Sequence, residues 1–154
     1  RLRQKSNQDV YIVIDTIHNR LQVHRGEHVL TDAVCATGSG KFLLGPKLRT
    51  WHFDTPKGVF TILRKVEDPI WAKPEWAFIE QGKPAPVLPW AFNRLDPSAL
   101  GKYALRLGDG YEIHGTIYPA LLGRHITHGC IRLDDVDLQS AYENTRAGNK
   151  VYIY

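Results

Sequence analysis

The stretch "VYIVIDTIHNRLQVHRGEHVLTDAVCAT" (Val10–Thr37) decides the fold class, because it consists of short β-forming runs separated by turn residues. Val10–Thr16 is rich in β-branched and aromatic side chains, Leu21–Arg25 alternates apolar and polar residues, and Val29–Thr37 is again strand-like. Such composition and period-two alternation are typical of β-strands. The polar tetrapeptides "IHNR" and "RGEH" between the runs are turn signals. The sequence therefore predicts a meander of three strands.

Later segments extend the β pattern and add one helix. We expect strands at Val59–Val66, Gly101–Leu107 and Tyr111–Gly115, and a last strand in the terminal "KVYIY". The segment "DDVDLQSAYENTRAGNK" predicts a helix, because Asp134 is a good N-cap, acidic residues follow it and Gly148 comes after the expected end. The sequence predicts a mainly β protein with one helix in its C-terminal region.

The segment from Glu67 to Leu100 has neither helical nor strand periodicity. It carries Trp71, Trp76 and Trp90, together with six of the nine prolines. An irregular stretch longer than about 12–15 residues inside a compact domain is usually functional or disordered, and disordered segments are poor in aromatic residues. We therefore expect an ordered lid packed over the sheet. The alternative is a purely structural excursion that covers a sheet edge.

Length and composition limit the function classes. A chain of 154 residues fits one domain, which we expect to span residues 9–154 after a tail or linker at residues 1–8. The net charge is only +4 and no run of five like charges occurs, so we expect no nucleic-acid partner. No apolar stretch approaches the ~18–20 residues that span a membrane. Because the sequence lacks methionine altogether, we expect a fragment of a longer precursor without its export signal.

The stretch "RHITHGCIRLDD" (Arg124–Asp135) places Cys130 next to a histidine and a glycine, and three interpretations compete for it. The first is a zinc site formed with His114, His125 and His128, but the paired spacings of zinc sites are missing, so we expect no metal and no other cofactor. The second is a structural cysteine at a strand end. The third is a catalytic nucleophile. The other cysteine, Cys35, lies in an apolar run and is expected to be an inert, buried thiol.

Nucleophilic catalysis requires a base for the thiol and donors for the developing oxyanion. His114, at the end of a predicted strand, can supply the base even though it is distant in sequence, because the fold can bring the two residues together. The backbone N–H groups of His128, Gly129 and Cys130 can supply the oxyanion donors. All the components of a cysteine acyltransferase are therefore present in the sequence.

The segment "IHGTIYPALLGRHITHGCIRLDDVDLQSAYENTRAGNKVYI" resembles the C-terminal signature of L,D-transpeptidase catalytic domains of the YkuD or ErfK type. The family pattern is "HG", about a dozen residues, and then "[S/T]HGC" followed by an apolar residue and Arg or Asn. "TPKGVFTI" (Thr55–Ile62) matches an upstream strand entry of the same family. The segment "LGKYALRLGDGYEIHGT" is similar to the Gram-negative branch. The combination is specific, and the resemblance covers about Val10 to the end.

The resemblance implies a β-sandwich or barrel-like fold and a set of site residues. Cys130 would be the nucleophile, His114 the base or the cationic partner of a thiolate, and Gly115 the residue that orients the imidazole through its carbonyl. Arg132 would bind a substrate carboxylate, with an ion pair to Asp134 or Asp135 as the alternative. The remaining residues of the "THGC" motif would shape the pocket or bind substrate: Thr127, His128 and Gly129.

The resemblance also implies a reaction and its partners. The enzyme would release D-alanine from a peptidoglycan tetrapeptide stem and transfer the acyl group of the third, diamino-acid residue to an amine. That amine would belong to a second stem or, in some members, to a lysine of an outer-membrane lipoprotein. The location would be the periplasm or the cell wall, and carbapenems would acylate the cysteine. Two alternatives stay open, an L,D-carboxypeptidase with the same site and a wall-binding module without activity.

Overall fold

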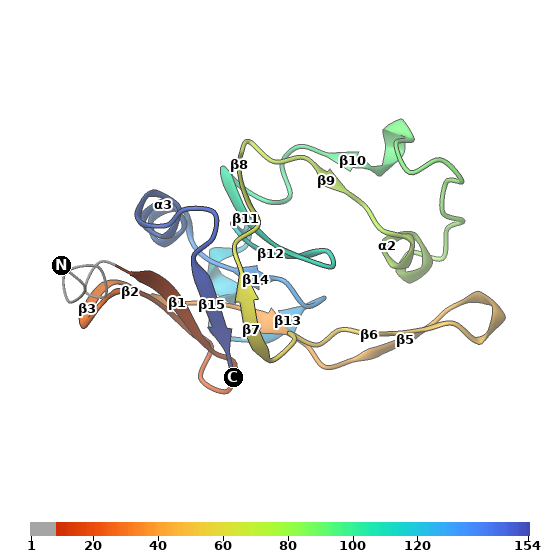
Figure 1. The fold of residues 1–154 in the computed structure, drawn as a ribbon. Helices are drawn as coiled ribbons and strands as arrows, with labels where there is room; N and C mark the ends of the chain where they lie inside the picture. Colours follow the sequence, from red (N-terminus) through yellow and green to blue (C-terminus); the bar gives the residue numbers. More distant parts are fainter. Residues whose placement is uncertain (1–8) are drawn as a thin grey trace.

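The computed structural model describes residues 9–154, and most of their regular structure is β (Figure 1). The expected tail at residues 1–8 lies outside the described residues. The strands are β1 (Val10–Asp15), β2 (Arg20–Arg25), β3 (His28–Val34), β4 (Thr37–Gly38), β5 (Phe42–Leu44), β6 (Thr50–His52), β7 (Gly58–Thr61), β8 (Arg64–Glu67), β9 (Trp71–Ala72), β10 (Leu95–Asp96), β11 (Tyr103–Gly108), β12 (Tyr111–His114), β13 (His125–Thr127), β14 (Ile131–Arg132) and β15 (Lys150–Ile153). The helices are α2 (Glu75–Glu80) and α3 (Asp135–Asn144), with short 3-10 turns η1 (Pro46–Leu48), η2 (Phe92–Arg94) and η3 (Pro119–Leu121). The prediction of a mainly β fold is confirmed.

Two main sheets share one hydrophobic core. The first has the strand order β3-β2-β1-β15-β7, and the second has the order β14-β12-β11-β8. Side chains of both sheets meet in the core, for example Ile12 from β1 and Ile113 from β12, and Leu138 of α3 joins them. The alternation predicted for β2 is seen directly, because every second residue is buried, and β1 has a similar burial pattern. We call these two sheets and α3 the sheet frame.

The helix α3 begins where the sequence predicts. The Asp134 carboxylate accepts a hydrogen bond from the Asp137 N–H at 2.7 Å, which satisfies one of the free donors of the first turn. The helix packs against β3 and β11, and it buries Leu138 and Ala141. It therefore covers one side of the shared core.

The single strand predicted at Val59–Val66 is wrong. The chain leaves the first sheet at the end of β7 and enters the second sheet as β8, where it pairs with β11. Ile62, between the two strands, is fully buried in the shared core. A run of apolar residues that crosses from one sheet to the other has the same composition as one continuous strand, so the sequence does not reveal the break.

Two segments project from the sheet frame on the same side of the molecule (Figure 1). One is the β5–β6 hairpin, a segment in which the sequence predicts no strand. The other comprises residues 68–100 and is called the lid segment here; it contains the β9–β10 pair and the short helix α2. The prediction of a segment without regular structure is thus wrong for these parts, although six residues of helix and two-residue strands are too short to give a periodic pattern.

Candidate active site

The parallel pairing of β12 with β14 brings the two "HG" motifs together. In this register Ile113 lies opposite Ile131 and His114 lies opposite Arg132, so Cys130 enters the sheet beside β12. His114 and Cys130 line the same cavity, whose volume is about 570 Å³. The sheet frame, the hairpin and the lid segment all contribute to its walls: Trp51, Phe53, Trp71, Trp76, Arg106, Tyr111, Glu112, Thr127, His128 and Arg132.

His114 is a buried histidine with one nitrogen committed to the backbone. Its side chain is 5% exposed, and Nδ1 lies 2.7 Å from the carbonyl oxygen of Gly115. Because a carbonyl oxygen only accepts, Nδ1 carries the proton and the neutral ring keeps a lone pair on Nε2. Burial lowers the pKa of His114 to about 4, and the nearby Arg132 charge acts in the same direction. The imidazole is therefore neutral at physiological pH, with Nε2 available as an acceptor.

Cys130 lies at the cavity wall as a neutral thiol. Burial raises its pKa to about 11, although the Glu112 N–H and the Arg132 charge favour the thiolate. Its Sγ donates a weak hydrogen bond to the carbonyl oxygen of Gly110 at 3.6 Å. The free protein thus holds a neutral thiol and a neutral imidazole in one cavity, rather than a thiolate–imidazolium pair. A neutral thiol beside a neutral imidazole suits a mechanism in which the imidazole removes the thiol proton as the sulfur attacks.

Gly115 cannot be replaced by a larger residue without moving the chain. Its N–H donates to the carbonyl of Leu100 at 2.7 Å. A Cβ atom at Gly115 would lie 3.1 Å from the Gly101 Cα and 3.1 Å from the Leu100 oxygen. The glycine therefore lets the end of the lid segment pack directly against the residue whose carbonyl orients His114.

The loop that presents Cys130 is fixed by Thr127. This threonine is buried; its Oγ1 donates to the Cys130 carbonyl at 2.6 Å and accepts from the Gly129 N–H at 3.1 Å. Gly129 has a φ of +125°, and a Cβ there would lie 2.8 Å from the Tyr111 ring. Of the three N–H groups expected to serve as oxyanion donors, that of Gly129 is thus engaged with Thr127. The groups of His128 and Cys130 remain for that task.

Thr55 supports the same loop, which the sequence analysis did not foresee. Its buried Oγ1 donates to the Gly129 carbonyl at 2.9 Å and accepts from the Gly38 N–H at 2.8 Å. The residue belongs to the "TPKG" motif, which carried the family resemblance but no assigned role. The only signal in the sequence was the motif itself, because the burial and the hydrogen bonds of the Thr55 hydroxyl are seen only in the structure.

His128 connects the loop of residues 127–130 to the lid segment. Its ring stacks on Trp76 at a centroid distance of 4.0 Å and packs edge-on against Phe53 at 4.6 Å. Its Nε2 lies 2.9 Å from a carboxylate oxygen of Glu80, in the last turn of α2. Sequence reasoning missed Trp76 and Glu80 as neighbours of the site, because the contact joins segments about 50 residues apart and α2 itself was not predicted.

Arg132 presents a charge to the cavity. Within residues 9–154 no carboxylate forms an ion pair with it, so the alternative of a pair with Asp134 or Asp135 is not seen. Burial lowers the pKa of Arg132, and the nearby Cys130 and Tyr118 groups oppose that shift. The guanidinium is thus available to a ligand in the cavity.

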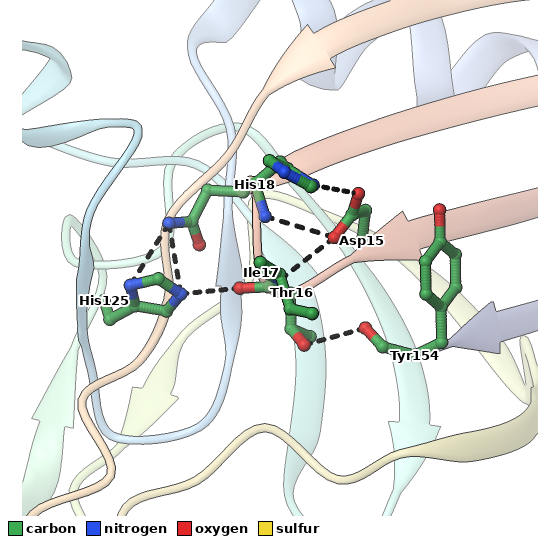
Figure 2. Close-up of polar contacts among 7 residues, drawn as sticks. Asp15, Thr16, Ile17, His18, His125 and Tyr154 are labelled. Carbon is green, nitrogen blue, oxygen red and sulfur yellow. Dashed lines mark hydrogen bonds and ion pairs between the residues drawn. The ribbon is translucent and has the colours of Figure 1, made fainter.

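The histidines considered for a metal site point to different partners. Figure 2 shows His125 beside the carbonyl of Thr16, which accepts from Nε2 at 2.5 Å. His114 instead contacts the Gly115 carbonyl, and His128 contacts Glu80. His18, which was not considered for the metal site, pairs with Asp15 in Figure 2. In the same view Thr16 Oγ1 donates to the carbonyl of Tyr154, so these contacts hold the β1–β2 turn to β13 and the chain end. Within the described range, no three His, Cys, Asp or Glu side chains gather as metal ligands do.

None of the helices in the part of the chain that the structure describes has the length and apolar character needed to cross a membrane.

The chain is similar to known proteins over nearly its whole length. Residues 9–153 match the model of the L,D-transpeptidase catalytic domain. The Escherichia coli (strain K12) protein named Probable L,D-transpeptidase ErfK/SrfK is 35% identical over 102 residues, which cover 65% of this chain and 33% of that protein. Probable L,D-transpeptidase YbiS of the same strain is 30% identical over 151 residues, covering 91% of this chain and 46% of that protein. The chain thus spans between a third and half of these relatives.

Solved structures show the same fold. An L,D-transpeptidase from Mycobacterium smegmatis superposes with a TM-score of 0.67 at 21% identity, covering 95% of this chain and 58% of that one. The catalytic domain of the Enterococcus faecium L,D-transpeptidase gives a TM-score of 0.65 at 19% identity, covering 96% and 98% of the two chains. Together with the family match, these similarities show that the chain belongs to the L,D-transpeptidase catalytic domain family.

Proposed function

We propose that residues 9–154 form a cysteine-dependent L,D-transpeptidase domain that acts on peptidoglycan stem peptides. The observation that carries this proposal is the shared cavity of His114 and Cys130, with Nδ1 of the imidazole bonded to Gly115 and Nε2 free to accept a proton. The family match over residues 9–153 supports the reaction class. No metal or other cofactor takes part in the proposed chemistry.

In the first half-reaction, the Cys130 sulfur attacks the carbonyl carbon of the third, diamino-acid residue at its L-centre. The thiol proton passes to Nε2 of His114 as the carbon–sulfur bond forms. The tetrahedral intermediate then collapses, the bond to the terminal D-alanine breaks, and the imidazolium returns the proton to the leaving amine. A thioester between Cys130 and the stem remains.

In the second half-reaction, an amine attacks the thioester, His114 removes one of its protons, and the sulfur leaves as the thiol. The acceptor we propose is the diamino-acid side chain of a second stem, with a lipoprotein lysine as the other amine. Such chemistry would take place in the periplasm or at the cell wall. The lid segment, which contributes Trp71 and Trp76 to the cavity wall, would keep water from the thioester and so favour aminolysis over hydrolysis.

The remaining site residues have supporting roles in this proposal. Arg132 would bind a stem carboxylate through its guanidinium, which has no carboxylate partner within residues 9–154. The N–H groups of His128 and Cys130 would stabilise the oxyanion. Gly129 would allow close approach of the substrate backbone. The Sγ–Gly110 bond of the free protein would be given up on substrate binding, since catalytic hydrogen bonds often form only in the complex.

Incubation of the purified protein with tetrapeptide muropeptides tests the proposal. Crosslinked dimers joined through the third residues are expected, together with free D-alanine, and Cys130→Ala should yield neither while unfolding at the same temperature as the wild type. Tripeptide without dimers would instead establish an L,D-carboxypeptidase. Product formation by Cys130→Ala would exclude the covalent mechanism.

A carbapenem provides a second measurement that needs no acceptor. Intact-protein mass spectrometry should find one adduct on the wild type and none on Cys130→Ala, with Cys35 as an internal reference. Cys35 is fully buried and burial raises its pKa to about 12, so it should stay unmodified. A wild-type protein that forms no adduct and releases no D-alanine would fit the wall-binding module instead.

A further inference from the structure

Exposed apolar side chains gather on the two segments that project from the sheet frame. In the lid segment Val87, Trp90 and Phe92 are 96%, 71% and 93% exposed, and at the hairpin tip Leu48 is 85% exposed. Figure 1 shows the hairpin and the loop after α2 at the same extremity of the molecule. Clustered exposure of large apolar groups marks an interaction surface. We call residues 41–51 and 83–94 the two arms.

The arm of the lid segment holds its shape although its apolar side chains are exposed. Arg94 links two parts of the lid segment, because its guanidinium donates to the Pro86 carbonyl at 2.6 Å and to the Lys73 carbonyl at 3.0 Å. Three prolines, Pro84, Pro86 and Pro89, restrict the backbone further. An arm held in this way presents Val87, Trp90 and Phe92 with little loss of conformational entropy on binding.

The hairpin arm is attached to the lid segment. Arg49, next to the hairpin tip, forms an ion pair with Glu75 in the first turn of α2, and its guanidinium also lies over the Trp51 ring. The two arms are therefore joined through α2.

All charged residues of the two arms are basic. Residues 41–51 contain Lys41, Lys47 and Arg49, residues 83–94 contain Lys83 and Arg94, and neither stretch contains an Asp or Glu. The nearest acidic residues of α2 are already engaged, Glu75 with Arg49 and Glu80 with His128. The extremity thus combines exposed aromatic and aliphatic groups with unopposed lysines.

We propose that the two arms dock the protein on an anionic lipid surface. Tryptophan and phenylalanine side chains partition into the interface of a bilayer, and lysine side chains are attracted by anionic headgroups. The apolar groups stand on projecting arms rather than in a groove, which suits insertion between lipids better than a fit to a folded partner. Docking of this kind needs no membrane-spanning helix and goes beyond the proposed activity.

Co-sedimentation with vesicles tests the docking directly. The protein should bind vesicles of phosphatidylethanolamine and phosphatidylglycerol, bind less as salt rises, and show little binding to phosphatidylcholine alone. The double variant W90S/F92S should partition about tenfold less, because it loses the two largest inserting groups. The charge reversal K47E/K83E should weaken binding at low salt. The matched control I17S/V136S removes two exposed apolar groups far from the arms and should bind like the wild type.

Two results would overturn the docking proposal. One is equal binding by W90S/F92S and the wild type, with both shown to be folded by thermal unfolding. The other is no binding to anionic vesicles; if the wild type then forms a concentration-dependent dimer that W90S/F92S does not, the arms bind a second copy of the chain. The Cys130→Ala variant should bind vesicles like the wild type, so failure of the proposed catalysis and failure of docking are separate outcomes.

Discussion

The sheet frame and the lid segment are ordered by different forces, although both contact the same cavity. In the frame, the strands bury Ile12, Leu105 and Ile113 completely. In the lid segment only Pro69, Phe78 and the terminal Leu100 are buried. Its other contacts are polar or aromatic: the Arg94 hydrogen bonds, the His128–Glu80 pair and the Trp71–Trp76 contact. Stability should therefore depend mainly on the frame, while the lid segment should affect the site and its surroundings.

The largest expected effect is the change with pH in the alkylation rate of Cys130, which lies in the cavity lined by both regions. Since burial raises the pKa of Cys130 to about 11, only the small thiolate fraction reacts at neutral pH. The rate of alkylation by iodoacetamide should rise about tenfold per pH unit, or roughly a thousandfold from pH 7 to pH 10, and level off near the pKa. Stopped-time mass spectrometry measures this rate, with Cys130→Ala as the blank. A rate that stays flat from pH 6 to pH 8 would show a thiolate–imidazolium pair and contradict a neutral resting state.

Shortening a leucine side chain should lower the free energy of unfolding much more in the sheet frame than in the lid segment. Leu138 of α3 is fully buried in the frame, and Leu138→Ala removes its contacts and leaves a cavity, which costs about 2–5 kcal/mol of the free energy of unfolding. Leu88→Ala deletes the same atoms at an exposed lid position and should change it by less than about 0.5 kcal/mol. Urea unfolding followed by circular dichroism measures both. Similar losses for the two variants would mean that the lid segment belongs to the cooperative core.

The same contrast explains what the sequence could predict. β2 follows from alternation, because one face of the strand is buried and the pattern records that burial, and β1 follows from its β-branched and aromatic composition. The break between β7 and β8 cannot be predicted from the pattern, because an apolar residue is expected at Ile62 whether the strand continues or crosses to the other sheet. Nor does α2 follow, since its six residues are too few for a periodic pattern and its contacts with His128 join segments distant in sequence.

The candidate site divides in a similar way. The "HG" and "THGC" motifs indicated His114 and Cys130 through the family resemblance. That these two residues line one cavity depends on the parallel pairing of β12 with β14. The neutral state of both groups comes from burial, which is a property of the assembled fold. Local motifs thus identify Cys130 and His114 as the candidate site residues, whereas their protonation is set by surroundings that no local pattern records.

A smaller loss of stability is expected where Thr55 holds the loop of residues 127–130. Thr55→Val keeps the shape of the side chain but removes its hydroxyl, which leaves the buried Gly129 carbonyl and Gly38 N–H without their partner. Unfolding should cost about 1–3 kcal/mol less free energy, and turnover should fall because the loop loses one of its supports. The exposed Thr50→Val is the control and should stay near the wild type. Unchanged stability in Thr55→Val would mean that water replaces the lost hydroxyl.

The smallest effect on stability should come from the contact between the two regions. Glu80→Gln preserves the size of the side chain and removes the charge that faces His128, a pair that is partly exposed. The free energy of unfolding should fall by less than about 1 kcal/mol. Because the same pair links α2 to the residue two positions before Cys130, kcat/KM for a tetrapeptide stem should fall about two- to fivefold, which corresponds to roughly 0.4–1 kcal/mol.

Glu75→Gln is the matched control for Glu80→Gln, since it removes an equally exposed carboxylate from the same helix but one that pairs with Arg49. If the helix affects the site through His128, the two variants should lose similar stability while only Glu80→Gln lowers kcat/KM. Equal losses of kcat/KM would show that the site responds to the helix as a whole. Equal activity of both variants and the wild type would show that the His128–Glu80 pair is not needed to position the loop before Cys130, because the stacking of His128 on Trp76 would then suffice.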